Sequence, residues 1–324
     1  MGSTDVTDRP LADTARLDDA ARAGWLYYVA GNTQDEIARK LGVSRQSAQR
    51  LVSLAVSERL VKVRLDHPIA KCMELSRALT DRFGLTLCEI VPSDPAAPEL
   101  LSGVAAAAAT ELERVLKSPE PRIIALGTGR ALSASVAQLP IMECPQHRIV
   151  ARLGNMMTDG SASPYNAVIR MSERVGARHY PFPLPVMARN REELQVLHAQ
   201  EPVRNTLELC QAADLTVVGI GQIDATAPLV VDGFISPDEM RGLMAAGAVG
   251  EITSWAYDGA GRLVDAEVMD RVLSAPLAPA RDRPVVGVAV GDSKIRAISA
   301  ALKGDLINGL ITNEVTATRV LALT

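Results

Sequence analysis

The 324-residue sequence predicts an α/β protein in two parts: an N-terminal all-α, winged helix-turn-helix domain and a larger, mainly parallel α/β domain. Three observations predict this fold class. Residues 33–52 carry the cap and turn residues of two short helices joined by a tight turn. Beyond residue 80, runs rich in β-branched residues alternate with helical patterns, as in a parallel sheet covered by helices. Hydrophobic residues make up 48% of the chain but aromatic residues only 3%, so the core must be aliphatic.

The first part of the chain is expected to hold a tail and a small domain. Residues 1–17 are polar with few large apolar groups, so we expect a disordered tail there. The winged helix-turn-helix domain is assigned to residues 18–66 and the second domain to residues 67–324. The boundary lies beside Pro68, because proline ends the strand pattern that precedes it.

The helix-turn-helix has clear start and stop signals. Thr33 and Glu36 form a capping box, which satisfies free amides at a helix start. Gly42 is suited to end this helix, and Ser44 is a good N-cap for the second. An apolar block at residues 25–29 predicts a preceding helix that closes a three-helix core. Residues 60–65 alternate apolar and basic side chains, which predicts the strand of a short wing.

Charge and side-chain type favour DNA as the partner of this domain. Between Arg39 and Arg64 there are seven basic residues and one acid, in a chain of net charge −4. A basic island on an acidic chain suits phosphate contact, whereas a solvated helix face, the alternative, more often mixes signs. The expected DNA-binding residues lie at the helix starts and on the outward face of the second helix: Thr33, Ser44, Arg45, Gln46, Ser47, Gln49 and Arg50.

The second domain is expected to alternate strands and helices along the chain. Patterns rich in β-branched residues predict strands at residues 86–91, 122–126, 148–153, 215–220, 251–257, 285–290 and 306–310. Helical patterns between them predict helices at residues 99–116, 130–138, 191–199, 237–245 and 293–302.

Four loops that follow these strands combine glycine with polar residues. The first, residues 127–130, and the last, residues 291–294, each open a helix with a cation, an arrangement suited to an anion. A single such loop is more often structural, but four at equivalent strand ends favour one pocket for a phosphorylated or polyhydroxylated ligand. The expected effector-binding residues are Gly127, Thr128, Gly129, Arg130, Asn155, Gly221, Gln222, Asp224, Glu251, Asp258 and Lys294.

Other classes of protein find little support in the sequence. The chain lacks the common hydrolase, zinc-protease and nucleotide-binding motifs, so we expect no enzyme and no catalytic residue. Four cysteines and four histidines are dispersed, and we expect no metal and no cofactor. No apolar run is long enough to cross a bilayer and the N-terminus does not resemble a secretory signal, so a cytoplasmic location without a membrane partner is expected.

Five segments resemble the SorC-type family of sugar-binding transcriptional regulators over nearly the whole chain: DEIARKLGVSRQSAQRLV, ALGTGRAL, VVGIGQID, FISPDEMRGLMAAGAVGEI with YDGAGRLVD, and GDSKIRAISAALKGDLINGLITNEVTA. The resemblance implies a Rossmann-like effector domain similar to sugar-phosphate isomerases and deaminases but without catalysis. It also implies a sugar, polyol or sugar-phosphate effector, a homo-oligomer (dimer or tetramer) and operator DNA of a carbohydrate operon as partners. One departure from the family is Asp292, which stands where relatives more often have a second glycine and which we expect to meet a sugar hydroxyl.

Two alternative functions remain open at this stage. The first is an enzyme of the sugar-phosphate isomerase class with an appended DNA-binding module, in which Lys294 could form a Schiff base. The second is a helix-turn-helix used only for protein interaction, which the basic island disfavours.

Overall fold

The computed structural model describes residues 11–58, 60–61, 69–157, 160–163, 165–280 and 283–323, with side chains from Ala15 onward. The chain divides into two compact units, Met1–His67 and Pro68–Thr324. The division lies one residue beyond the boundary expected from the sequence.

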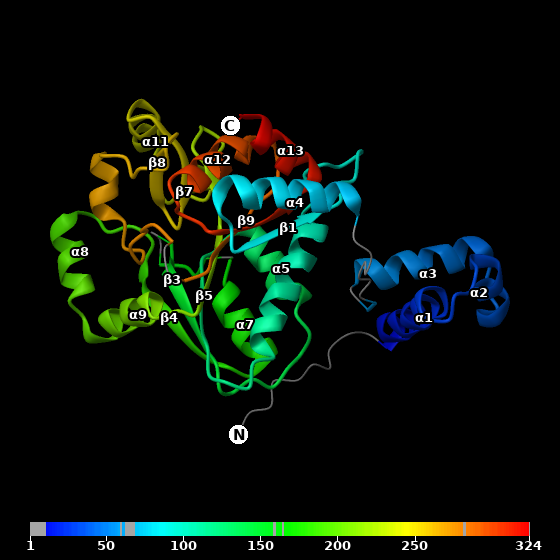
Figure 1. The fold of residues 1–324 in the computed structure, drawn as a ribbon. Helices are drawn as coiled ribbons and strands as arrows, with labels where there is room; N and C mark the ends of the chain where they lie inside the picture. Colours follow the sequence, from blue (N-terminus) through cyan, green and yellow to red (C-terminus); the bar gives the residue numbers. More distant parts are fainter. Residues whose placement is uncertain are drawn as a thin grey trace, which may run out of the picture. The chain divides into compact units, whose positions relative to one another are not determined.

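The first unit contains three helices, α1 (Leu11–Tyr28), α2 (Gln34–Leu41) and α3 (Arg45–Ser57) (Figure 1). Helix α1 begins at Leu11, inside the segment for which we expected a disordered tail to residue 17. Residues 1–10 lie outside the described part of the chain, as do residues 62–68, so most of the expected wing strand is not described.

The capping predictions for α2 and α3 are confirmed. The Thr33 hydroxyl accepts a hydrogen bond from the Glu36 amide, and the Glu36 carboxylate accepts one from the Thr33 amide. Gly42 ends α2 in the left-handed region, with φ 66°. The Ser44 hydroxyl caps α3 by accepting from the Ser47 amide at 3.1 Å. These local bonds hold α2 and α3 on either side of one tight turn.

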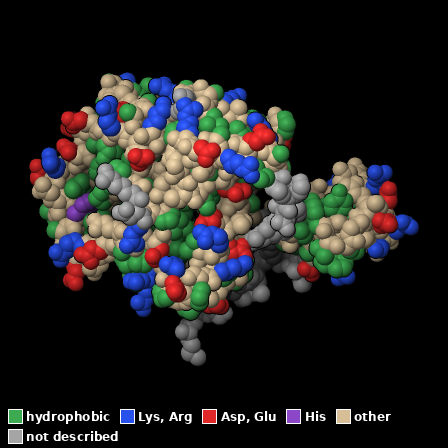
Figure 2. Space-filling model, in the orientation of Figure 1, with side chains coloured by type: hydrophobic (Ala, Val, Ile, Leu, Met, Phe, Trp, Pro, Cys, Tyr) green, Lys and Arg blue, Asp and Glu red, His purple; other side chains and the backbone are tan. Residues whose placement is uncertain are grey.

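The small core of this unit has Leu26 of the expected 25–29 block packed against it, but not the aromatic residues of that block. It is built from Ala23, Ile37, Ala38, Ala48 and Val52. Small residues let α1 and α3 approach closely, since a Cβ on Gly24 would lie 2.8 Å from the Ala55 Cβ. The aromatic block therefore lies outside the core: Trp25 is 56% exposed, and Tyr27, Tyr28 and Val29 are exposed as well. Hydrophobic side chains gather on the face of this unit visible in Figure 2.

In the described part of the second unit, seven parallel strands form one sheet in the order β1-β10-β9-β5-β2-β3-β4. The strands are β1 (Leu87–Val91), β2 (Ile123–Leu126), β3 (Arg148–Met156), β4 (Arg178–Pro185), β5 (Leu215–Gly219), β9 (Val285–Val288) and β10 (Gly309–Asn313). The expected mainly parallel α/β domain is confirmed.

Helices cover both faces of this sheet (Figure 1). On one face α5, α6 and α7 pack on Ile124, Leu126 and their neighbours. On the other face α4, α12 and α13 pack on the β1–β10–β9 side, and α9 packs near β2 and β3. The helices are α4 (Ala70–Phe83), α5 (Leu101–Leu116), α6 (Arg130–Gln138), α7 (Ala167–Val175), α8 (Arg191–His198), α9 (Glu201–Gln211), α10 (Pro228–Val231), α11 (Pro237–Ala245), α12 (Ile295–Lys303) and α13 (Glu314–Leu323), with 3-10 turns η1 (Glu267–Arg271) and η2 (Asp292–Lys294).

Three sequence-based assignments are corrected by the structure. The expected single strand at residues 251–257 is a hairpin of β7 (Ala248–Ile252) and β8 (Trp255–Asp258), joined to β6 (Gly221–Gln222) in a small antiparallel sheet. The strand expected at residues 306–310 is shifted toward the C-terminus, as β10. Strand β4 was not predicted, because its sequence RHYPFPLP holds three prolines and lies at the sheet edge, where proline is tolerated. Among the described helices, none has the length and apolar character of a membrane span.

Candidate functional site

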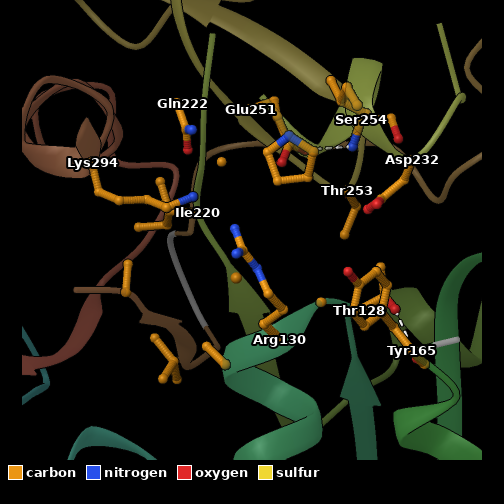
Figure 3. Close-up of a pocket in the computed structure, with 18 of the residues that line it drawn as sticks. Thr128, Arg130, Tyr165, Ile220, Gln222, Asp232, Glu251, Thr253, Ser254 and Lys294 are labelled. Atoms are coloured by element: carbon orange, nitrogen blue, oxygen red, sulfur yellow. Dashed lines mark hydrogen bonds between the residues drawn. The ribbon is translucent and has the colours of Figure 1, made fainter. Parts of the chain in front are cut away.

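A cavity of about 240 Å³ opens at the carboxyl ends of the central strands (Figure 3). Its wall is formed by the loops that follow β2, β5 and β9, together with the β7–β8 turn and the segment after α10. Parallel sheets place their ligand sites at this edge, because the loops that connect strands to helices converge there.

Two cations reach into the cavity. Arg130 opens α6 directly after Gly129, whose φ of 110° turns the chain from β2 into the helix. Lys294 ends the short η2 turn before α12. Both side chains reach the same part of the cavity in Figure 3. Burial lowers the pKa of Lys294. The negative charges of Glu251 and Asp224 oppose this change, and the positive charge of Arg130 adds to it.

A buried carboxylate lies across from Lys294. Glu251 Oε2 accepts a hydrogen bond from the Ser254 amide at 2.8 Å, drawn as a dashed line in Figure 3. Burial raises the pKa of Glu251, against the opposing effects of that hydrogen bond and of Lys294. A Cβ on Gly221 would overlap the Glu251 carboxylate, so a larger residue here would displace the Glu251 side chain. No ion pair joins Glu251 to Lys294 among the described residues, so a bound molecule can interact with either group.

Three buried oxygens in the cavity wall lack a hydrogen-bond partner within the described part of the chain. They are Gln222 Oε1, Thr253 Oγ1 and Asp232 Oδ2. Thr253 and Ser254 form the β7–β8 turn with φ values of 50° and 71°, in the left-handed region that residues other than glycine seldom adopt. Buried polar groups without partners cost free energy, so these three sites favour a ligand that supplies hydrogen bonds.

The structure brings most of the predicted effector residues together. Those that line the cavity are Thr128, Gly129, Arg130, Gly221, Gln222, Glu251 and Lys294. Gly127 and Asn155 instead line a smaller pocket on the other side of Thr128.

The predicted acids at positions 224, 258 and 292 lie outside the cavity wall. Asp224 accepts hydrogen bonds from the amide and hydroxyl of Thr226. Asp258 accepts from the Arg262 amide and is paired with the Arg262 guanidinium, so it closes the turn after β8. Asp292 is paired with Arg319 and does not line the cavity, so its expected contact with a sugar hydroxyl stays a prediction. The carboxylates of Asp224 and Asp258 are thus used in short-range turns, and that of Asp292 in an ion pair with a distant helix.

Several polar residues of the cavity were not found from the sequence: Glu99, Tyr165, Asp232, Thr253 and Ser254. They come from loops far apart in the chain and carry no local motif. Glu99 accepts a hydrogen bond from the Asp292 amide at 3.1 Å. Burial raises the pKa of the Tyr165 hydroxyl, and the charge of Asp232 raises it further.

The expected DNA-binding residues lie at the start of α3 and along its outer face, except Thr33, which is the N-cap of α2. Arg45, Gln46, Gln49 and Arg50 are exposed. Arg45 forms an exposed ion pair with Asp35 at 3.5 Å. The hydroxyls of Thr33, Ser44 and Ser47 take part in helix caps or in the contact between the two serines.

Comparison with known proteins matches both units. The family described as "Putative sugar-binding domain" matches residues 67–322. The chain is 35% identical to the "Erythritol catabolism regulatory protein EryD" of Brucella abortus, covering 94% of this chain and 96% of that protein. It is 32% identical to the "Transcriptional regulator LsrR" of Enterobacter sp., covering 98% and 99%. The full-length sorbitol operon regulator SorC of Klebsiella pneumoniae superimposes with a TM-score of 0.70 at 26% identity, covering 93% of this chain and 97% of that one.

Proposed function

The chain belongs to the SorC-type family of sugar-binding transcriptional regulators, and from this premise we propose that its cavity binds the effector and its α3 helix binds operator DNA. The relatives are named as regulators of transcription or of sugar and polyol operons. In this proposal the protein acts as a homo-oligomer, and the bound effector changes its affinity for the operator by shifting the arrangement of the subunits.

The proposed effector is a linear polyol or its phosphate. The carrying observation is the chemistry of the cavity: three unpartnered buried oxygens, on Gln222, Thr253 and Asp232, and two cations, Arg130 and Lys294. Hydroxyl groups of a polyol can donate to the carboxylate and amide oxygens, and an oxyanion or hydroxyl oxygen can accept from the cations. EryD and SorC are named for erythritol catabolism and a sorbitol operon, and both compounds are linear polyols.

A thermal-shift series tests the effector proposal. Erythritol, sorbitol and the phosphate of each are added to the purified chain over a range of concentrations. A true effector should stabilise the protein by about 2.7 kcal/mol at one hundred times its Kd, because it binds only the folded state. Comparing each polyol with its phosphate shows whether the cations select a phosphate. If none of the four compounds raises the melting temperature, the effector class is wrong.

A second test addresses the α3 surface. Replacing Arg50 by alanine is expected to weaken binding to the operator about 10-fold to 100-fold, since a base or phosphate contact of arginine is lost. Arg45→Ala should have the smaller effect, because the guanidinium of Arg45 is already engaged by the Asp35 carboxylate in an exposed ion pair and is less available to DNA than that of Arg50. Fluorescence anisotropy with promoter DNA measures both. As a control, the effector should stabilise each variant as much as it stabilises the wild type. If Arg45→Ala and Arg50→Ala both bind the operator with wild-type affinity, α3 is not the recognition helix.

A sugar-phosphate isomerase activity is the second candidate, because Glu251 and Lys294 place a buried acid and a buried amine in one cavity. Incubation with a panel of sugar phosphates, followed by product analysis, decides between the two. Sustained turnover would favour the enzyme, and its absence at high protein concentration would favour a regulator that only binds.

A further inference from the structure

A polar groove runs beside the recognition helix in the first unit. One wall is Arg16 of α1. The other wall belongs to α3 and consists of Gln46, Gln49, Arg50, Ser53, Leu54 and Ser57. Three of these α3 residues are the ones expected to contact DNA, so the groove continues the proposed DNA-binding surface onto a different helix.

The packing of α1 against α3 explains why Arg16 lies there. With about 100° per residue, Arg16 falls on the same face of α1 as Ala20 and Ala23, one turn nearer the N-terminus. Ala20 and Ala23 are fully buried. The close approach of the two helices at Gly24 and Ala55 brings the exposed end of that face next to α3.

The groove has the chemistry of an anion-binding surface. Its lining offers two guanidinium groups, two side-chain amides and two hydroxyls, and no carboxylate among the described residues. Arg16 and Arg50 are exposed, and neither forms an ion pair within the described part of the chain. A guanidinium group without a carboxylate partner is free to donate two parallel hydrogen bonds to two oxygens of one phosphate.

We propose that Arg16 binds a backbone phosphate of the DNA that lies along α3, so that α1 adds a contact outside the recognition helix. The inference rests on the proposed DNA-binding role of α3. A phosphate contact positions the protein but carries no sequence information, so Arg16 contributes affinity for any duplex.

The test compares the full-length protein with Arg16→Ala on a fluorescein-labelled duplex of random sequence, about 40 base pairs long, across a salt series. Arg16→Ala should bind roughly five- to tenfold more weakly at about 0.1 M salt, and its log–log salt slope should fall by about 0.9. Arg16→Lys should recover most of the affinity, since it keeps the charge. Melting temperatures establish that all variants are folded.

Arg22→Ala is the matched control. It removes the same charge from the same helix, but position 22 lies about 200° around α1 from Ala20 and outside the groove. The inference holds if Arg22→Ala keeps the wild-type affinity and slope while Arg16→Ala loses both. It is overturned if Arg16→Ala and Arg22→Ala have the same affinity for the duplex and the same salt slope. It is also overturned if Arg16→Ala loses binding to polyglutamate but keeps its affinity for the duplex, a result that would indicate an acidic protein partner. Failure of the wild-type chain to bind any duplex would instead overturn the proposed DNA-binding function.

Discussion

Lys294→Met is expected to abolish the stabilisation that the effector gives, while the variant without ligand melts no lower than the wild type. Lys294 is largely buried, and burial already lowers its pKa, so the folded protein bears a cost for holding this charge. Methionine has a similar length without the charge. Losing the charged contact should weaken effector binding by about 2–4 kcal/mol, roughly 30-fold to 1,000-fold. Melting curves with and without the effector measure both quantities.

Lys303→Met provides the control for this prediction. Lys303 lies at the end of α12, the helix that begins directly after Lys294, but is exposed and outside the cavity wall. Its replacement should leave the ligand-induced shift intact. If the effector raises the melting temperature of Lys294→Met as much as that of the wild type, the effector binds elsewhere. DNA binding by the variant without effector should match that of the wild type.

Gly154→Ala is expected to destabilise the second unit by about 3 kcal/mol, lowering the melting temperature by roughly 6–12 °C. A Cβ at this position of β3 would overlap the carbonyl oxygens of Leu184 and Pro185 in β4. These are backbone atoms, which cannot rotate away as a side chain would. The pairing of β3 with β4 is irregular around Gly154, with a shift of register on each side of the Gly154–Phe182 pair.

Gly242→Ala is the matched comparison, because Gly242 lies inside helix α11 and an added Cβ there meets nothing within 4 Å. Alanine in a helix interior is favoured over glycine by about 0.5–1 kcal/mol, so this variant should melt slightly higher than the wild type. Calorimetry should therefore show a lower melting temperature for Gly154→Ala and a slightly higher one for Gly242→Ala. Equal melting temperatures would mean that β3 and β4 can move apart at little cost.

The sequence-based predictions are accurate where a feature depends on residues close together in the sequence. The caps at Thr33 and Ser44 and the turn at Gly42 involve bonds between residues three or four apart, and all three were predicted. The strand-end loops around Arg130, Gln222 and Lys294 were also found, because glycine after a buried strand is a local signal.

Features set by distant contacts were not predictable in this way. The β7–β8 turn uses Thr253 and Ser254 in the left-handed region, where a sequence reader expects glycine or asparagine. Asp232 and Tyr165 enter the cavity from loops whose positions depend on the packing of the whole unit. The aromatic residues near Trp25 were assigned to the core on hydrophobicity alone, although alanines occupy the face of α1 that packs on α3.

The prolines of β4 have a consequence for how copies of this protein can associate. As the outermost strand, β4 would otherwise present a row of free amides on which a strand from a second molecule could add. Alternate residues of a strand direct their amides to the same side. Pro181, Pro183 and Pro185 carry no amide hydrogen, so they remove three successive donors from one such row. Sheet extension between molecules is therefore blocked at this edge, which protects the protein from aggregation there.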